Sequence, residues 1–271
     1  MEMIAEILSY SFMVRALVVG LLVSVCAALL GVSMVLKRYS MIGDGLSHVG
    51  FASLAAATAM NAAPLRVAIP VCVLAAFFLL RLSENSKMKG DAAVAILCSG
   101  SLAVGVMVIS LTSGVNTDVY NYMFGSILAV SDEDAFLSIL LSVVVLILFL
   151  LFYNRIFAVT FDENFTRATG TRAGLYNMVL AALTAITVVL GMKIMGALLI
   201  SSLIIFPALT SMRLCKKYRS VMIVSVAVSV VCFMAGMLLS YQLATPTGAS
   251  IVCMNLAAFL IFAGIAAVKR K

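Results

Sequence analysis

The sequence predicts an all-α protein that forms a polytopic bundle of about nine transmembrane helices. Its composition is 64% hydrophobic and only 11% charged, and it contains no tryptophan. The mean hydropathy is +1.21, whereas soluble domains are usually only about 45–50% apolar. Because each crossing helix needs about 20 residues, a chain of 271 residues holds many crossings and little soluble structure beside them. We therefore expect a single transmembrane domain over residues 1–271.

Apolar stretches bounded by charged or turn-forming residues define the individual helices. In chain order, we expect crossings at residues 12–36, 43–60, 65–82, 92–111, 136–153, 175–192, 194–212, 220–240 and 249–268. The first stretch is too long for a signal-peptide core and has no cleavage pattern before Lys37, so it should remain in the mature protein. Lys193 and Gly196 divide residues 175–212 into two crossings with almost no loop, so one of the two can be a broken helix.

Residues 119–131 are apolar but too short for a full crossing. An additional crossing there would reverse every later loop against the distribution of basic residues. We interpret the segment as an interfacial or re-entrant helix on the outer side, which is tolerated only where it packs against protein. The sequence is compatible with eight to ten crossings.

Basic residues gather in loops on one predicted side of the membrane. These loops hold fifteen of the eighteen lysines and arginines, and only Arg15, Arg66 and Lys193 fall on the other side. The positive-inside rule makes the basic side cytoplasmic, with the N-terminus outside and the C-terminus inside. The net charge of +7 therefore reflects membrane orientation, and we expect no nucleic-acid partner.

The six cysteines stand singly in or beside apolar stretches, without a C-x-x-C pair. This pattern favours buried, inert side chains over a disulfide framework. The cysteines are Cys26, Cys72, Cys98, Cys215, Cys232 and Cys253.

One ionisable pair lies deep within an apolar stretch. Asp44 and His48, the only histidine, are four residues apart and share a face of the predicted helix 43–60. Asp44 lies about 9 Å and His48 about 15 Å along a helix from Arg38, the latter near the middle of a roughly 30 Å hydrocarbon core. Ionisable groups at that depth indicate function, and a carboxylate and an imidazole are ligands for a divalent cation. Two alternatives are that Asp44 caps a helix beginning at Gly45 while His48 bonds a carbonyl, and that the pair relays protons.

Two ligands do not complete a zinc site, which usually has four. A symmetric dimer that places two copies of this helix together would provide two carboxylates and two imidazoles on a two-fold axis. Small residues around the pair would allow close approach of the helices; they are Gly43, Gly45, Ser47, Gly50 and Ser53.

The chain contains no G-x-x-x-x-G-K-[ST] phosphate loop, so any ATP hydrolysis must occur on a separate subunit. The longest predicted inner loop, residues 155–174, contains a segment in which Asp162 can cap a short helix and Gly170 can end it. A short cytoplasmic helix of this kind offers a contact for a soluble partner.

The residues from Leu36 to His48 (LKRYSMIGDGLSH) resemble the R-x-x-x-x-x-D-x-x-S-H segment of the ABC-3 permeases, membrane subunits of bacterial zinc and manganese importers. Further segments are similar to that family in the same order: 91–96, 122–128, 161–170, 196–200 and 205–208. The resemblance extends from about residue 12 to residue 268.

The resemblance implies a multi-pass permease of the bacterial inner membrane that forms a homodimer. Its implied partners are two cytoplasmic ATP-binding subunits and an extracellular metal-binding lipoprotein or periplasmic protein. Asp44 and His48 match the metal-coordinating pair of the family, and Pro207 matches a structural proline. The residues implied in coupling to the ATPase are Phe161, Asp162, Glu163, Phe165, Arg167 and Gly170.

We expect a transport mechanism by alternating access, with no catalytic residue and no resident cofactor. Zn²⁺ is favoured as the transported ion, with Mn²⁺ next, because imidazole ligands suit zinc. The resemblance does not separate these metals from iron. The alternative from another class is a proton-coupled secondary carrier that uses Asp44 and His48 without an ATPase. An intramembrane enzyme with metal-activated water is less compatible, because the chain has no second histidine.

Overall fold

The computed structural model describes residues 11–85, 90–112, 125 and 131–268. In these residues the chain forms eleven helices and no strand, which confirms the all-α prediction. Eight of the helices are long and apolar enough to cross a membrane. The helices are α2 (Ser11–Leu36), α3 (Ile42–Ala59), α4 (Pro64–Asn85), α5 (Gly90–Thr112), α7 (Asp132–Leu151), α8 (Tyr153–Phe161), α9 (Glu163–Ala168), α10 (Ala173–Met195), α11 (Ala197–Leu214), α12 (Tyr218–Leu243) and α13 (Thr247–Val268).

Each of the nine predicted crossings corresponds to one helix. Eight of these nine are the helices that are long and apolar enough to cross a membrane, and the ninth is α3. It is only 18 residues long and contains Asp44, His48 and several glycines and serines. These polar and small residues keep α3 from containing as long an apolar stretch as the other eight helices. The helix that carries the candidate site is therefore the one that departs from the apolar pattern.

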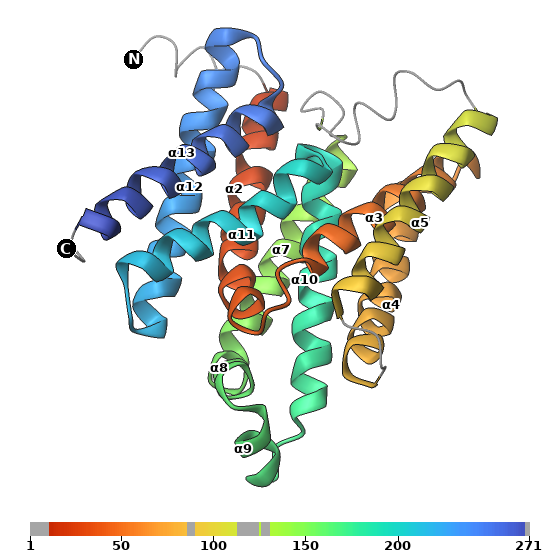
Figure 1. The fold of residues 1–271 in the computed structure, drawn as a ribbon. Coiled ribbons are helices and arrows are strands. Elements are labelled where there is room, and N and C mark those ends of the chain that lie inside the picture. Colours follow the sequence, from red (N-terminus) through yellow and green to blue (C-terminus); the bar gives the residue numbers. More distant parts are fainter. Residues whose placement is uncertain (1–10, 86–89, 113–124, 126–130, 269–271) are drawn as a thin grey trace.

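The central helices of the bundle connect its two flanks (Figure 1). Helices α3, α4 and α5 lie together on one flank, and α12 and α13 lie on the other, with α2, α7, α10 and α11 between them. Helices α8 and α9 project at one end, which we call the α9 end. The hydrophobic core joins α3 to its neighbours through residues such as Leu46, Phe51 and Leu54.

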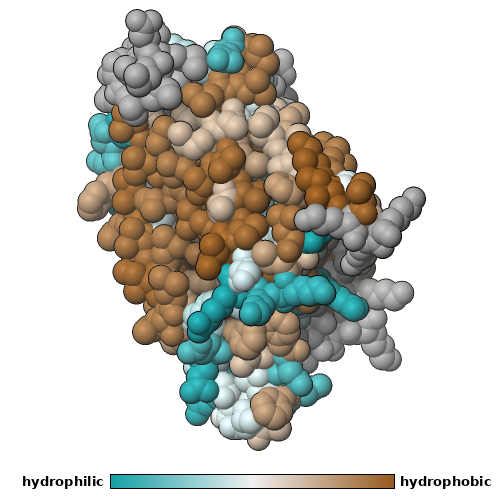
Figure 2. Space-filling model, turned by 90° about the vertical axis from the view of Figure 1, so that its left-hand side faces the viewer, coloured by the Kyte–Doolittle hydropathy of each residue, from teal (hydrophilic) through white to brown (hydrophobic). Residues whose placement is uncertain are grey.

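The flank formed by α13 is apolar on its surface. Figure 2 shows this side as broadly hydrophobic, with hydrophilic residues gathered towards the lower part of the view. Exposed apolar side chains on α13 include Leu256, Leu260 and Ile261. A helical bundle satisfies its backbone internally and can present such a surface to lipid. The chain is a multi-pass membrane protein.

The predicted division of residues 175–212 is confirmed, because α10 ends at Met195 and α11 begins at Ala197. Gly196 joins them with φ +88°, a conformation that glycine adopts at little cost. The interfacial helix expected at 119–131 lies outside the described residues, apart from Gly125 and Ser131. A Cβ on Gly125 would lie only 2.3 Å from the Met195 carbonyl carbon, so its backbone packs directly on this junction.

The region expected to be a loop from Arg155 onwards begins with a helix, α8, which sequence reasoning missed. Helix α7 ends before Phe152, and α8 continues from there in a new direction (Figure 1). Ile156 and Val159 of α8 are buried. Phe157 and Phe161 pack against Tyr218 at the start of α12, with ring centroids 5.0 and 5.7 Å apart. This aromatic contact fixes the position of α9, which follows immediately.

Candidate metal centre

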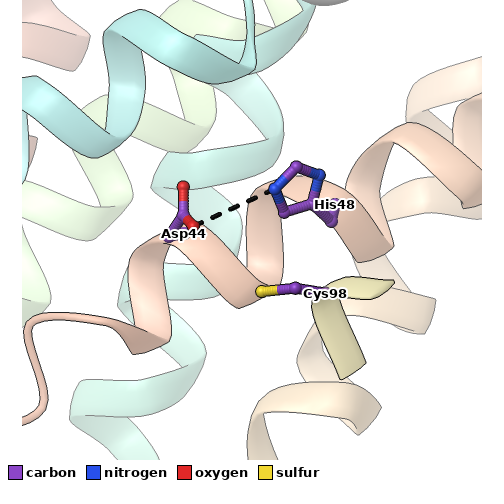
Figure 3. A group of neighbouring side chains, drawn as sticks. All are labelled: Asp44, His48 and Cys98. Atoms are coloured by element: carbon purple, nitrogen blue, oxygen red, sulfur yellow. Dashed lines mark ion pairs between the residues drawn. The ribbon is translucent and has the colours of Figure 1, made fainter. Parts of the chain in front are cut away.

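Asp44 and His48 project from the same face of α3, as their spacing predicts. The distance between Asp44 Oδ2 and His48 Nε2 is 3.9 Å (Figure 3). Both side chains are partly open, with exposed fractions of 38% for Asp44 and 21% for His48. They lie on the least buried stripe of α3, which continues through Ala52 and Ala56, while most of the rest of the helix is buried.

The α2–α3 connection shows that Asp44 does not cap its helix. Helix α3 begins at Ile42, so Asp44 lies in its first turn, and the capping position is Met41 without a side-chain cap. The interpretation of Asp44 as an N-cap residue before Gly45 is therefore wrong. A carboxylate within the first turn is still favoured by the positive end of the helix dipole.

Cys98 of α5 completes a group of three possible metal ligands. Its sulfur and one ligand atom each of Asp44 and His48 all lie within 4.8 Å of one another, and its side chain points towards the pair in Figure 3. Zinc holds such atoms at about 2.0–2.3 Å, which puts them roughly 3.5 Å apart around one ion. Small side-chain rotations would bring the three atoms to that separation.

Close packing of α3 on α5 brings this cysteine to the site. A Cβ on Gly45 would lie 3.2 Å from Val94 Cγ1 and 3.8 Å from Cys98 Sγ. A residue larger than glycine at position 45 would therefore press on Val94 and approach Cys98 of α5.

Ser201 of α11 orients the Asp44 carboxylate. Its hydroxyl donates a hydrogen bond of 3.1 Å to Asp44 Oδ1, while Oδ2 faces His48. A hydrogen bond to one oxygen of a ligating carboxylate holds the other in place for the metal. Nothing in the sequence separates Ser201 from the neighbouring serine, so sequence reasoning missed this contact.

The cysteines differ in their surroundings, although all six are free. Cys26, Cys72 and Cys232 are buried as expected, whereas Cys98 and Cys215 are only partly buried and Cys253 is exposed on α13. The prediction of burial is therefore wrong for these three, and Cys98 in addition faces the acid–histidine pair. Cys98 could not be found from spacing, because its proximity to Asp44 depends on how two non-consecutive helices pack.

The small residues of α3 pack within this chain. Gly43, Gly45, Ser47, Gly50 and Ser53 are all buried in the isolated protomer. A Cβ on Gly43 would lie 3.0 Å from Ile204 Cδ1 of α11, and one on Gly50 would lie 2.7 Å from Met192 Cε of α10. The expectation that these residues face a second copy is therefore wrong, because they allow α3 to approach α5, α10 and α11. The partly open stripe with Asp44 and His48 is the remaining face.

The predicted coupling segment divides between two helices. Asp162 is the N-cap of α9, where its carboxylate accepts a hydrogen bond of 2.8 Å from the Phe165 amide, as predicted. Gly170 follows the helix with φ +81°. Phe161 ends α8, and both Phe161 and Phe165 are largely exposed.

The acidic and basic members of the same segment behave differently. Glu163 turns back towards the bundle and contacts Lys37 and Asn177. Arg167 donates a 2.6 Å hydrogen bond to Glu163 from one turn further along α9 and is itself mostly exposed. The segment therefore has an exposed aromatic side and an inward-facing carboxylate.

Comparisons with known proteins give one consistent result. The model of the ABC 3 transport family matches residues 9–266. A Thermotoga maritima protein named "Probable metal transport system membrane protein" is 34% identical over 255 residues, covering 94% of this chain and 90% of the relative. The manganese import system permease protein ScaB of Streptococcus gordonii is 28% identical over 260 residues, covering 96% and 93%. A chain in the structure of PsaBC from Streptococcus pneumoniae in complex with Fab has a TM-score of 0.87 at 28% identity, covering 96% and 94%.

Proposed function

The chain belongs to the ABC 3 transport family, and on this premise we propose that it is the permease subunit of an ATP-driven importer for a divalent transition metal. The observation that carries the proposal is the group formed by Asp44, His48 and Cys98, whose ligand atoms lie within 4.8 Å of one another. Ionisable side chains in such an apolar protein are costly to bury, and binding a cation offsets that cost. The ion is cargo and is held only in passing.

Ligand chemistry favours zinc as the cargo. A carboxylate, an imidazole and a thiolate are all zinc ligands, whereas manganese prefers carboxylate, carbonyl and water oxygens. The second candidate is manganese, which the printed name of the Streptococcus gordonii relative supports. A fourth ligand would come from water or from a second copy of the chain.

A homodimer would place two such sites together. The stripe of α3 with Asp44 and His48 stays partly open, and beside it lies a groove of about 460 Å³ between α3, α4 and α5. Aliphatic side chains line this groove together with small residues that include Ala52, Ala56, Gly100 and Ser101. We propose that the second permease copy packs on this flank and that the metal passes between the two protomers.

The energy source lies on a separate subunit, because the sequence has no phosphate loop. The exposed Phe161 and Phe165 at the α9 end support an apolar contact with that ATP-binding subunit, and the proposal accordingly puts the α9 end on the cytoplasmic side. A metal-binding lipoprotein or periplasmic protein delivers the ion at the opposite end. Alternating access then opens the site first to the outside and later to the inside.

Reconstituted transport tests the proposal. Liposomes that contain the permease, its ATP-binding subunit and the metal-binding protein should accumulate zinc only when ATP is supplied. The Asp44→Asn and His48→Ala variants should assemble normally and lose uptake. Uptake that a proton gradient drives without ATP would instead establish a secondary carrier in which the Asp44–His48 pair moves protons.

A further inference from the structure

Glu163 joins the short helix α9 to two long helices of the bundle. Its Oε2 accepts hydrogen bonds from Lys37 Nζ at 3.3 Å and from Asn177 Nδ2 at 3.1 Å. Lys37 also donates a hydrogen bond to Asn177 Oδ1, which closes a three-membered polar cluster. Lys37 immediately follows α2, and Asn177 belongs to the first turns of α10.

This cluster is largely withdrawn from water. The side chain of Lys37 is 7% exposed and that of Glu163 is 27% exposed, and Asn177 is buried. Charges in such surroundings need their partners, because removal of one leaves the other poorly solvated. The contact therefore holds α9 to the bundle in a defined geometry, unlike an ion pair on an exposed surface, which contributes little.

Lys37 is linked to the metal site by a short and well-ordered turn. Asp44 lies seven residues after Lys37. The Tyr39 amide donates a 2.8 Å hydrogen bond to the Met34 carbonyl, which joins the turn to the end of α2. The Ile42 amide donates a 3.0 Å hydrogen bond to the Tyr39 carbonyl, which joins the turn to the start of α3. Arg38 adopts a left-handed conformation with φ 62°. A displacement of Lys37 is therefore transmitted through few freely rotating bonds to the first turn of α3.

We propose that Glu163 is the positioning residue that transmits movement of α9 to the metal-site helix α3, by holding Lys37, and to α10, by holding Asn177. The inference rests on the proposed function, in which α9 contacts the ATP-binding subunit. It assigns Glu163 a role distinct from that of Phe161 and Phe165, since its carboxylate faces the bundle while both rings are exposed. Glu163 acts on the cargo only through other residues.

The chain offers a matched control for this role. Arg155 of α8 donates an exposed hydrogen bond of 3.2 Å to Thr171 Oγ1, just after α9, and does not contact Glu163. The Arg155→Gln variant removes a charged contact beside α9 without loosening the link from Glu163 to the bundle. Glu163→Gln and Asn177→Ala weaken the link between elements.

The experiment measures zinc uptake and ATP hydrolysis in the same liposomes, using the complete transporter. For Glu163→Gln we expect hydrolysis within about twofold of wild type and at least a tenfold loss of uptake, so that the number of ions moved per ATP falls at least fivefold. Asn177→Ala should lower this ratio in the same direction, and Arg155→Gln should leave it unchanged. The exchanged pair Lys37→Glu with Glu163→Lys should recover part of the ratio.

Three results would overturn the inference. An unchanged ratio in Glu163→Gln would show that the link carries no motion, and a proportional loss of hydrolysis and uptake would show a docking role instead. Failure of both Glu163→Gln and Asn177→Ala to assemble would make the cluster purely structural. Wild-type liposomes that import no metal with ATP would overturn the proposed function itself, which is a distinguishable outcome.

Discussion

At the scale of single residues, the candidate metal site consists of the three possible ligands and of the side chains that orient them. Ser201 donates to Asp44 Oδ1, and loss of such a supporting hydrogen bond typically weakens metal binding about 10–100-fold. We expect Ser201→Ala to raise the zinc dissociation constant about tenfold in a competition titration of the purified permease.

Ser202 provides the control for this substitution. Its hydroxyl donates to the Leu199 carbonyl within the same helix, so Ser202→Ala should leave zinc affinity unchanged. Equal affinities of the wild type and both serine variants would contradict the supporting role of Ser201.

The inward-facing carboxylate gives a prediction about pH. Burial raises the pKa of Glu163, but the hydrogen bond from Asn177 and the positive charge of Lys37 lower it by more, so its pKa in the folded protein lies below the ordinary value of 4.5. A carboxyl of this kind stabilises the fold at pH above its unfolded pKa, and the contribution disappears as the pH falls through its folded pKa.

We therefore expect the Tm difference between wild type and Glu163→Gln to stay constant from about pH 8 to about pH 6. The difference should shrink below pH 4.5, the ordinary pKa of this side chain. Thermal unfolding of both proteins in detergent at each pH measures this Tm difference. A difference that already changes between pH 8 and pH 6 would assign the effect to another group.

At the scale of elements, close helix contacts depend on individual glycines. A Cβ on Gly31 of α2 would lie 2.1 Å from the Ile204 carbonyl oxygen of α11, a backbone atom that has little freedom to move. Overpacking of this kind typically costs about 1–3 kcal/mol. We expect Gly31→Ala to lower the Tm of the permease.

Gly264→Ala on α13 is the matched control, because no atom lies within 4 Å of the added methyl group. Alanine is also the better helix former. A Tm of Gly31→Ala that equals that of Gly264→Ala would contradict the close α2–α11 contact.

The helices themselves could largely be predicted, because membrane crossings leave a strong signal of apolar length. The break at Gly196 was also predictable from Lys193 and the glycine. Helix α8 could not be separated from the preceding span, since Phe152, Tyr153 and Ile156 are apolar on both sides of the bend. The local pair Asp44 and His48 follows from helical spacing, whereas Cys98 and Ser201 reach the site through tertiary packing that no local pattern encodes.

At the scale of the whole molecule, polar contacts gather at both ends of the central helices. Opposite the α9 end, Arg15 at the start of α2 pairs with Asp132 of α7, and Lys193 of α10 pairs with Asp134 at 2.5 Å. Arg66 lines a pocket with Glu133 and Asp134. The three basic residues predicted to lie outside thus meet the one acidic cluster predicted there, which agrees with the predicted relative sidedness.

Helices α2 and α10 contribute to the polar contacts at both ends. Arg15 and Lys37 belong to or adjoin α2, and Lys193 and Asn177 belong to α10. These two helices therefore connect the α9 end to the opposite end through the bundle.

Assembly with the ATP-binding subunit gives a prediction at this scale. Phe165 is 65% exposed at the α9 end, and aromatic side chains of this kind often dominate binding at interfaces. We expect Phe165→Ala to weaken co-purification of the ATP-binding subunit at least tenfold. Leu260→Ala, which truncates a similarly exposed apolar side chain on α13, should leave co-purification unchanged, and equal loss in both variants would contradict docking at α9.

X-ray absorption at the zinc edge of the metal-loaded permease examines the ligand group itself. We expect one sulfur at about 2.3 Å together with nitrogen and oxygen at about 2.0–2.2 Å. The sulfur shell should vanish in Cys98→Ser and persist in Cys253→Ser, and Asp44→Asn and His48→Ala should abolish stoichiometric zinc. A zinc spectrum that none of the substitutions at Asp44, His48 and Cys98 changes would show that the ion binds elsewhere.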